Sequence, residues 1–157
     1  MGLTKSYSII GFLVTLLLSF VIASNIESYR HPESVNFLRE SLLESLELQK
    51  EQSNNPTLNE TFDQFISDLE YHLIERNYKK LSLIRIIGCV VALFGSIFLR
   101  QKKIIGLHLF LGGSLFALIG SFYFIGFSLS GWVLNFSFLI FTLVSGLYFI
   151  KKRVYFI

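Results

Sequence analysis

Arg85 is the residue of this chain whose charge lies deepest in an apolar run, and it is the first candidate for chemistry. The run is LSLIRIIGCVVALFGSIFL, from Leu81 to Leu99. An arginine at the centre of a bilayer costs about 2.5–3.5 kcal/mol on insertion scales, and it costs less near the edge. Such a side chain either extends to the membrane surface or turns inward to a polar partner.

Polar groups on the other apolar runs lie at a similar depth. Arg85 is about 22 Å from Arg100 along a helix that rises 1.5 Å per residue, and Glu27, Tyr123 and Asn135 lie near the matching ends of their own runs. We therefore predict a polar intramembrane cluster in which Glu27 holds Arg85, and Tyr123 or Asn135 accepts further hydrogen bonds. The same cluster could bind an anionic headgroup instead, and the sequence does not separate the two.

The remaining ionisable residues give little support for catalysis or metal binding. His108 and Ser145 are polar groups expected at the inner side, but no acidic residue lies in a run to complete a proton relay. Asp68, His72 and Glu75 fall on one helix face with neighbouring basic residues, which favours a solvated surface over a metal site. The chain has no Ser-His-Asp set in reach, no cysteine pair and no phosphate loop. We expect no enzyme activity, no metal and no cofactor.

Four apolar runs explain the mean hydropathy of +0.57, and they contain 13 of the 17 phenylalanines in the 157 residues. They cover approximately residues 7–26, 81–99, 104–127 and 132–150. Each is close to the roughly 20 residues that a helix needs to cross about 30 Å of hydrocarbon. The prediction is an all-α integral membrane protein, a four-helix transmembrane bundle with an extracytoplasmic helical hairpin between the first two spans.

The charges divide the chain into three parts. All eleven acidic residues lie between Glu27 and Glu75, so residues 27–80 form the polar hairpin domain. Residues 1–26 form the first span, with a cleaved signal peptide as the alternative because Lys5 precedes the apolar stretch and VIAS ends it. Residues 81–157 form three spans with short loops and a basic tail.

Two amphipathic helices fit the polar domain. The first is expected from Pro32 to about Gln52, and the second restarts behind Asn55, with Pro56 as its first residue. No Gly or Pro lies between Thr57 and Ile87, so the second helix could continue into the next span. Apolar residues beside the seam predict a further surface for a second copy, a partner or the membrane: Phe37, Leu43, Ile66 and Ile74.

Small residues recur at four-residue spacing along the first three spans. This pattern lets helix backbones approach closely where lipid supplies no hydrophobic drive. Packing within the chain is the favoured interpretation, and contact with a second subunit is the alternative. The helix-packing residues are Gly11, Gly88, Ala92, Ser96, Gly113, Ala117 and Ser121.

The basic residues predict the orientation. Lys5, residues 100–103 and residues 151–153 all fall on one side of the four spans, and Lys and Arg concentrate on the cytoplasmic side of membrane proteins. Both termini are therefore expected in the cytoplasm, and the low Pro content with much Ile, Phe and Lys favours a bacterial inner membrane. Because the basic residues flank spans, no nucleic-acid partner is expected.

These features favour a non-enzymatic multi-pass membrane protein, an interaction or accessory subunit that acts through its hairpin and its small-residue helix faces. The expected partners are the lipid bilayer and either a second copy or another membrane protein. A small oligomeric transporter or channel is the alternative, although ion pathways normally carry charged groups at depth. The spacing of the spans also resembles that of immunity proteins against pore-forming bacteriocins, which leaves an immunity-type membrane protein as a further alternative.

Overall fold

The computed structural model describes residues 2–127 and 129–152, and all secondary structure in these residues is α-helical. This confirms the predicted all-α fold. The helices are α1 (Gly2–Arg30), α2 (Ser34–Gln52), α3 (Pro56–His72), α4 (Glu75–Arg100), α5 (Ile105–Ile125) and α6 (Leu129–Lys151).

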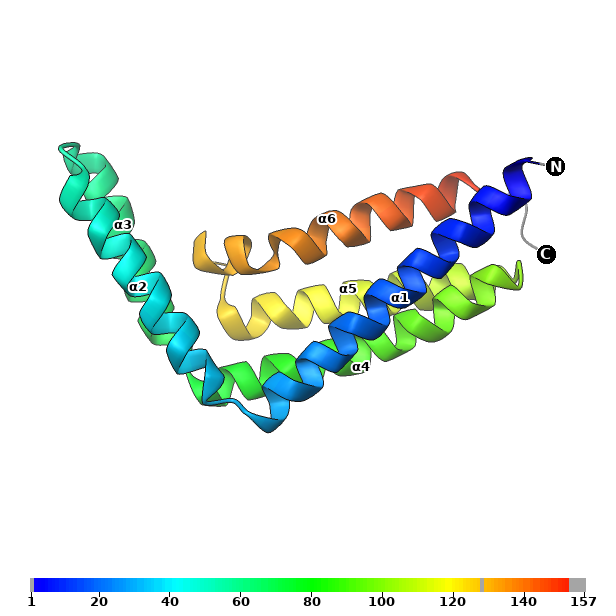
Figure 1. Ribbon diagram of the computed structural model, residues 1–157, viewed down its shortest axis with the longest axis horizontal. Coiled ribbons are helices and arrows are strands. Elements are labelled where there is room, and N and C mark those ends of the chain that lie inside the picture. Colours follow the sequence, from blue (N-terminus) through cyan, green and yellow to red (C-terminus); the bar gives the residue numbers. More distant parts are fainter. Residues whose placement is uncertain (1, 128, 153–157) are drawn as a thin grey trace.

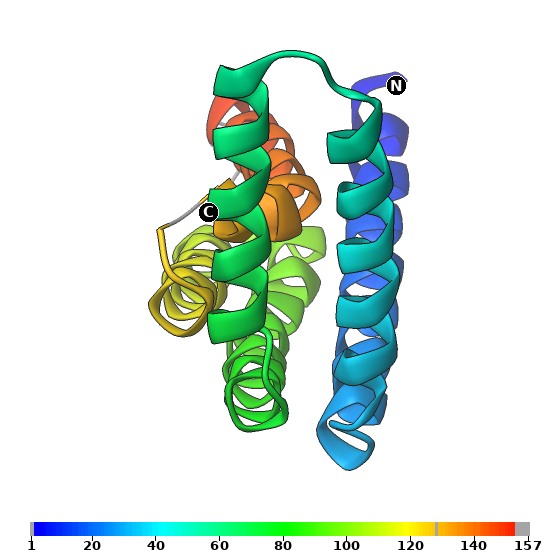
Figure 2. The ribbon, with the colours of Figure 1, turned by 90° about the vertical axis from the view of Figure 1, so that its left-hand side faces the viewer.

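Four of these helices, α1, α4, α5 and α6, are long and apolar enough to cross a membrane. They pack side by side as a bundle in which α4 contacts both α1 and α5, and α6 lies on α5 (Figures 1 and 2). The bundle core contains the fully buried side chains of Leu18, Cys89, Phe110 and Phe149. The rings of Phe110 and Phe149 meet edge to face at 5.3 Å between centroids, which joins α5 to α6.

Helices α4 and α5 pack with their backbones in close approach at the small residues. A Cβ atom added to Gly113 would lie 2.5 Å from both the Gly88 carbonyl oxygen and the Ala92 amide nitrogen. One added to Gly88 would lie 2.7 Å from the Cβ of Ala117. These glycines therefore allow a helix contact that any larger residue would separate, and the small-residue faces of α4 and α5 pack against each other within the chain.

Helix α1 contacts α4 through its own small polar residues. The hydroxyl groups of Thr15 and Ser96 are hydrogen-bonded at 2.9 Å, and a Cβ atom on Gly11 would lie 2.9 Å from the Cγ of Arg100. Ser19, the third small residue of this series, is exposed, and its hydroxyl donates to the carbonyl oxygen of Thr15. Thr15 and Ser96 thus add a polar contact to an interface whose buried residues Leu18, Cys89 and Ala92 are apolar.

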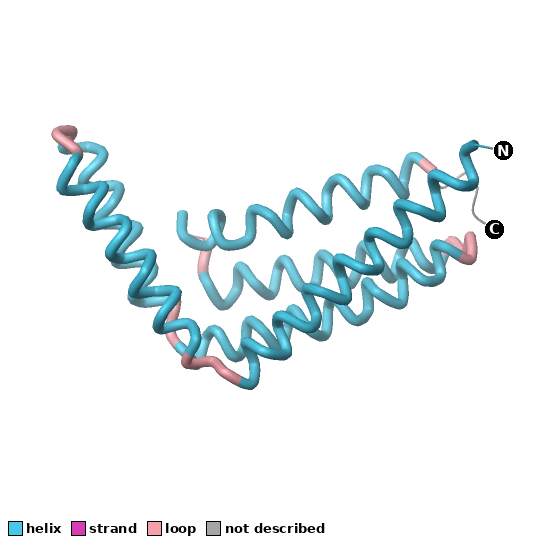
Figure 3. Tube along the Cα trace, viewed as in Figure 1, coloured by secondary structure: helices cyan, strands magenta, loops and turns pink. Residues whose placement is uncertain are grey.

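The hairpin of α2 and α3 bends away from the axis of the bundle (Figures 1 and 3). Asn55 caps α3 by accepting a hydrogen bond from the Thr57 amide at 3.1 Å, and Pro56 occupies the first turn, as the sequence predicted. Val35, Leu69 and Leu73 are buried in the seam between the two helices. The hairpin therefore has a small apolar core of its own.

The helix is interrupted between α3 and α4 at Leu73 and Ile74, where the sequence had allowed one continuous helix. Side chains from both sides satisfy the carbonyl groups that the break frees. The Arg39 guanidinium donates to the Leu73 carbonyl at 3.5 Å, and the Asn77 amide donates to the His72 carbonyl at 3.2 Å. This break turns the hairpin relative to α4.

The first turn of α1, the loop between α4 and α5, and the end of α6 lie at one end of the bundle, and the hairpin lies at the other (Figure 1). Cations stack on aromatic rings at both ends, as membrane-interface residues do. Arg100 lies over the ring of Phe12 at one end, and Lys80 lies over the ring of Phe124 at the other, 5.7 Å from its centroid. The basic clusters at 100–103 and 151–152 therefore share one end.

Candidate functional site

The guanidinium of Arg85 is directed from α4 toward α5 and α6. Its Nε donates to the hydroxyl of Ser121 on α5 at 2.9 Å, and its Nη2 donates to Oδ1 of Asn135 on α6 at 2.7 Å. Hydrogen bonds from a charged donor are stronger than neutral ones. One arginine thus connects three of the four bundle helices.

Both acceptors are oriented by hydrogen bonds to their own helices. The Ser121 hydroxyl donates to the Ala117 carbonyl at 2.7 Å, which leaves its lone pairs free to face Arg85. The Asn135 amide donates to the Gly131 carbonyl at 2.8 Å, which fixes its oxygen toward the guanidinium. Ser121 and Asn135 are both fully buried, so this arrangement is rigid and dry on the α5–α6 side.

No carboxylate balances the charge of Arg85. The chain contains no Asp or Glu after Glu75. In residues 9–127 and 131–152, whose side chains the structure describes, the ion pairs are Lys50 with Asp63 and His31 with Glu27 and Glu33. Arg85 is therefore a partly buried cation held by neutral oxygen atoms.

Of the predicted polar cluster, the structure brings together Arg85 and Asn135. Glu27 lies elsewhere, with its side chain 69% exposed and its Oε1 3.7 Å from Nε2 of His31. Tyr123 is 78% exposed on the outer face of α5. Ser121, which the sequence marked only as a helix-packing residue, takes the place expected for Tyr123.

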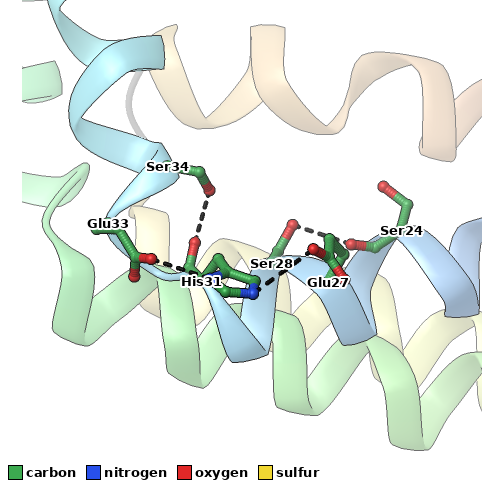
Figure 4. Close-up of polar contacts among 6 residues, drawn as sticks. All are labelled: Ser24, Glu27, Ser28, His31, Glu33 and Ser34. Atoms are coloured by element: carbon green, nitrogen blue, oxygen red, sulfur yellow. Dashed lines mark hydrogen bonds and ion pairs between the residues drawn. The ribbon is translucent and has the colours of Figure 1, made fainter.

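Glu27 belongs instead to a polar elbow, residues 27–34, where α1 turns into α2 (Figure 4). The His31 ring lies between the carboxylates of Glu27 and Glu33, at 3.7 and 3.0 Å. Ser34 donates to the His31 carbonyl at 2.7 Å. The pKa of Glu33 lies below its ordinary value because its own backbone N–H, and next His31, hydrogen-bond to the carboxylate.

A cleft of about 420 Å³ opens between α1 and α6, and Arg85 of α4 is one of its lining residues. This volume is in the range of small-molecule sites. Its polar lining is Ser24 and Asn25 from α1 and Ser137 from α6, and its apolar lining includes Leu17, Phe20 and Phe141. The cleft arises because α1 packs on α4 and α6 packs on α5, so the α1–α6 side of the bundle is not filled.

The inner-side polar residues lie apart from this cleft. His108 is exposed, and its Nδ1 lies 3.2 Å from the Ile104 carbonyl of its own helix. Ser145 is buried on α6, with 8% of its surface exposed. In the part of the chain that the structure describes, no three His, Cys, Asp or Glu side chains are grouped so that they could hold a metal ion.

The fold and the site together define a class of protein: an all-helical chain with four helices long and apolar enough to span a membrane, a bent helical hairpin, and a partly buried arginine that lines a cleft. Comparison with protein-family models, with curated proteins and with solved structures finds no match. The arguments about function therefore rest on the residues of this chain.

Proposed function

We propose that this chain is a non-enzymatic multi-pass membrane protein, an interaction subunit whose hairpin binds another protein chain beside the membrane. The observation that supports this proposal is the exposure of large apolar side chains on the hairpin. Phe37 is 78% exposed and Tyr71 is 75% exposed. Exposed apolar patches of this kind mark protein or membrane contacts.

Two exposed apolar residues, Phe37 and Leu48, share one face of α2. Phe37 and Leu48 are eleven residues apart, about three turns, so their side chains point in the same direction. Leu48 is 52% exposed. A partner helix lying along this face would cover both residues, whereas the seam on the opposite side of α2 is already filled by Val35 and its neighbours.

The base of the hairpin is held against the bundle, which presents this face in a fixed position. The Asn36 amide donates to Glu75 at the start of α4 at 2.7 Å, and Leu134 of α6 packs on the hairpin core. The His72 ring lies beside Gly126, where an added Cβ atom would lie 3.0 Å from Nε2. A preorganised surface binds with a smaller ordering cost.

Phe37→Glu is expected to reduce recovery of the partner, or of the oligomer, at least tenfold, because it puts a charge where an apolar contact is made. The measurement is crosslinking in native membranes followed by affinity purification. Gln49→Glu is the matched control, since it adds the same charge to the same helix. Gln49 is exposed, lies about three turns further along α2, and points about a third of a turn around the helix axis from Phe37. Equal recovery from both variants and the wild type would rule out this face.

The same proposal places the hairpin outside the cytoplasm and both termini inside, in the cell membrane of a bacterium. Asn54→Cys is expected to react with a membrane-impermeant maleimide in intact cells, and Gln101→Cys only after lysis. Both positions are exposed, and the native Cys89 is buried. Labelling of position 101 alone in intact cells would show that the protein has the opposite orientation in the membrane.

A further inference from the structure

Arg85 has donors that the protein does not use. A guanidinium carries five N–H groups, and the hydrogen bonds to Ser121 and Asn135 use two of them. The group also lines the α1–α6 cleft, so the unused donors lie next to open space. A partly buried cation without a counter-charge attracts negative groups, which favours an anion as the occupant.

Arg85 lies at the inner boundary of the headgroup layer when Lys80 is placed at the membrane surface. It lies five residues after Lys80, about 7.5 Å along α4. The headgroup layer on each side of a bilayer is about 5–7 Å thick. With Lys80 at the outer edge of that layer, Arg85 lies at its base, at the hairpin end of the bundle.

The walls of the cleft change from polar to apolar with depth. Ser24 and Asn25 lie near the hairpin end of α1, at the level of Arg85. Leu17 lies about 12 Å deeper than Asn25 along the same helix. On α6 the polar lining residue is Ser137, which follows Leu134, and Phe141 lies about 6 Å deeper than Ser137. A ligand that fills this cleft must have a polar head at the hairpin end and an apolar tail below it.

The mouth of the cleft faces the hydrocarbon. Phe20 is 71% exposed and Leu17 is 47% exposed, and both belong to the cleft wall. An occupant therefore enters sideways from the bilayer, where phospholipids are the abundant amphiphiles. A soluble anion would have to cross apolar surroundings to reach the same donors.

We propose that this cleft binds one anionic phospholipid from the leaflet on the hairpin side. Its phosphate group accepts hydrogen bonds from the free N–H groups of Arg85, and one acyl chain lies between α1 and α6 along Leu17, Phe20 and Phe141. Arg85 then has a counter-charge from the lipid that the chain itself does not provide. The lipid would also close the open side of the bundle.

Native mass spectrometry of the delipidated full chain in detergent tests this proposal with three probes: dioleoylphosphatidylglycerol, dioleoylphosphatidylcholine and inorganic phosphate. We expect one phosphatidylglycerol per chain, bound at least tenfold more tightly than phosphatidylcholine, and no measurable competition by millimolar phosphate. Phosphatidylcholine carries the same phosphate together with a compensating choline cation, so equal affinity for the two lipids would overturn the preference for a lipid of net negative charge. Full competition by inorganic phosphate would overturn the role of the acyl groove.

Two variants separate the head contact from the tail contact. Arg85→Gln is expected to reduce the preference for phosphatidylglycerol to less than about twofold, whereas Arg76→Gln, an exposed arginine on the first turn of the same helix, retains it. Ser137→Trp puts a large ring in the cleft and replaces neither of the residues that accept hydrogen bonds from Arg85. It is expected to lower lipid affinity at least tenfold, and Leu147→Trp, on an exposed face of α6, is expected to leave it unchanged.

Ser137→Trp keeps the proposal testable if Arg85→Gln fails to fold. Wild-type affinity in a folded Ser137→Trp protein would show that the lipid binds elsewhere. Loss of the preference in Arg76→Gln as well would reduce the effect to general surface charge. A dimer that dissociates on Ser137→Trp without any bound lipid would assign the cleft to a second copy of the chain.

Discussion

Gly113→Ala is expected to lower the free energy of unfolding of the bundle by about 3 kcal/mol, the upper part of the range for overpacked cores. The added Cβ would lie 2.5 Å from two backbone atoms of α4, which belong to Gly88 and Ala92. Backbone atoms cannot rotate away as a flexible side chain can, so α4 and α5 must separate. Equilibrium unfolding in mixed micelles, followed by circular dichroism, measures the change.

The adjacent glycine provides the control. A Cβ atom added to Gly112 would have nothing within 4 Å, and this residue is exposed. Gly112→Ala is therefore expected to change the free energy of unfolding by less than about 1 kcal/mol, with the higher helix propensity of alanine acting in its favour. Equal destabilisation by the two substitutions would show that the glycines matter for the helix backbone alone, and not for the contact between α4 and α5.

The sequence predicted the helices because their signals are local. Each apolar run is long enough to cross a bilayer, and Asn55 followed by Pro56 is a helix start whose hydrogen bond forms within three residues. Val35 and Leu42 are seven residues apart, two turns of a helix, and both pack in the seam of the hairpin, so helical periodicity also indicates that seam. Such features need no knowledge of the rest of the fold.

The break between α3 and α4 could not be predicted in the same way. No Gly or Pro marks it, and its freed carbonyl groups are satisfied by Arg39 from α2 and by Asn77 from the start of α4. Tertiary contacts with the bundle decide whether the helix ends there. The packing of Leu134 and of Gly126 against the hairpin is such a contact, and the sequence gives no sign of it.

The candidate site was predictable in depth but not in direction. Counting residues along each run placed Glu27, Tyr123 and Asn135 near the level of Arg85. It did not show which way each side chain points around its helix. Asn135 faces inward, whereas Glu27 and Tyr123 are exposed. The distinction depends on how the helices are rotated against each other.

The residues that the sequence analysis missed had signals for a different role. Ser121 appeared only as the last member of a small-residue series on the third span, and its hydroxyl proved to be an acceptor for Arg85. Ser24 and Ser137 line the cleft. Ser24 appeared only in the VIAS stretch of the alternative signal peptide, and Ser137 belongs to no recognisable motif. A serine is small enough for a helix contact and polar enough for a hydrogen bond, so spacing alone cannot assign its role.

A double-mutant cycle on Arg85 and Asn135 is expected to give an interaction energy of about 1–2 kcal/mol in the free energy of unfolding. Asn135→Leu leaves a charged donor without its acceptor, and losing a hydrogen bond to a charged group costs about 1.5–3 kcal/mol. Arg85→Met leaves the oxygen atoms of Ser121 and Asn135 without their donor. The double variant removes both partners and should cost less than the sum of the two single changes.

Glu27 provides the comparison that distinguishes the observed network from the one predicted by depth alone. The Glu27 carboxylate is exposed and lies beside His31, so Glu27→Gln combined with Arg85→Met should be additive within about 0.5 kcal/mol. Hydrogen bonds between membrane helices average about 0.6 kcal/mol in such cycles. The larger value expected for Arg85 with Asn135 reflects a formal charge and a fully buried acceptor. Coupling to Glu27 together with additivity at Asn135 would place the guanidinium at the elbow instead of between α5 and α6.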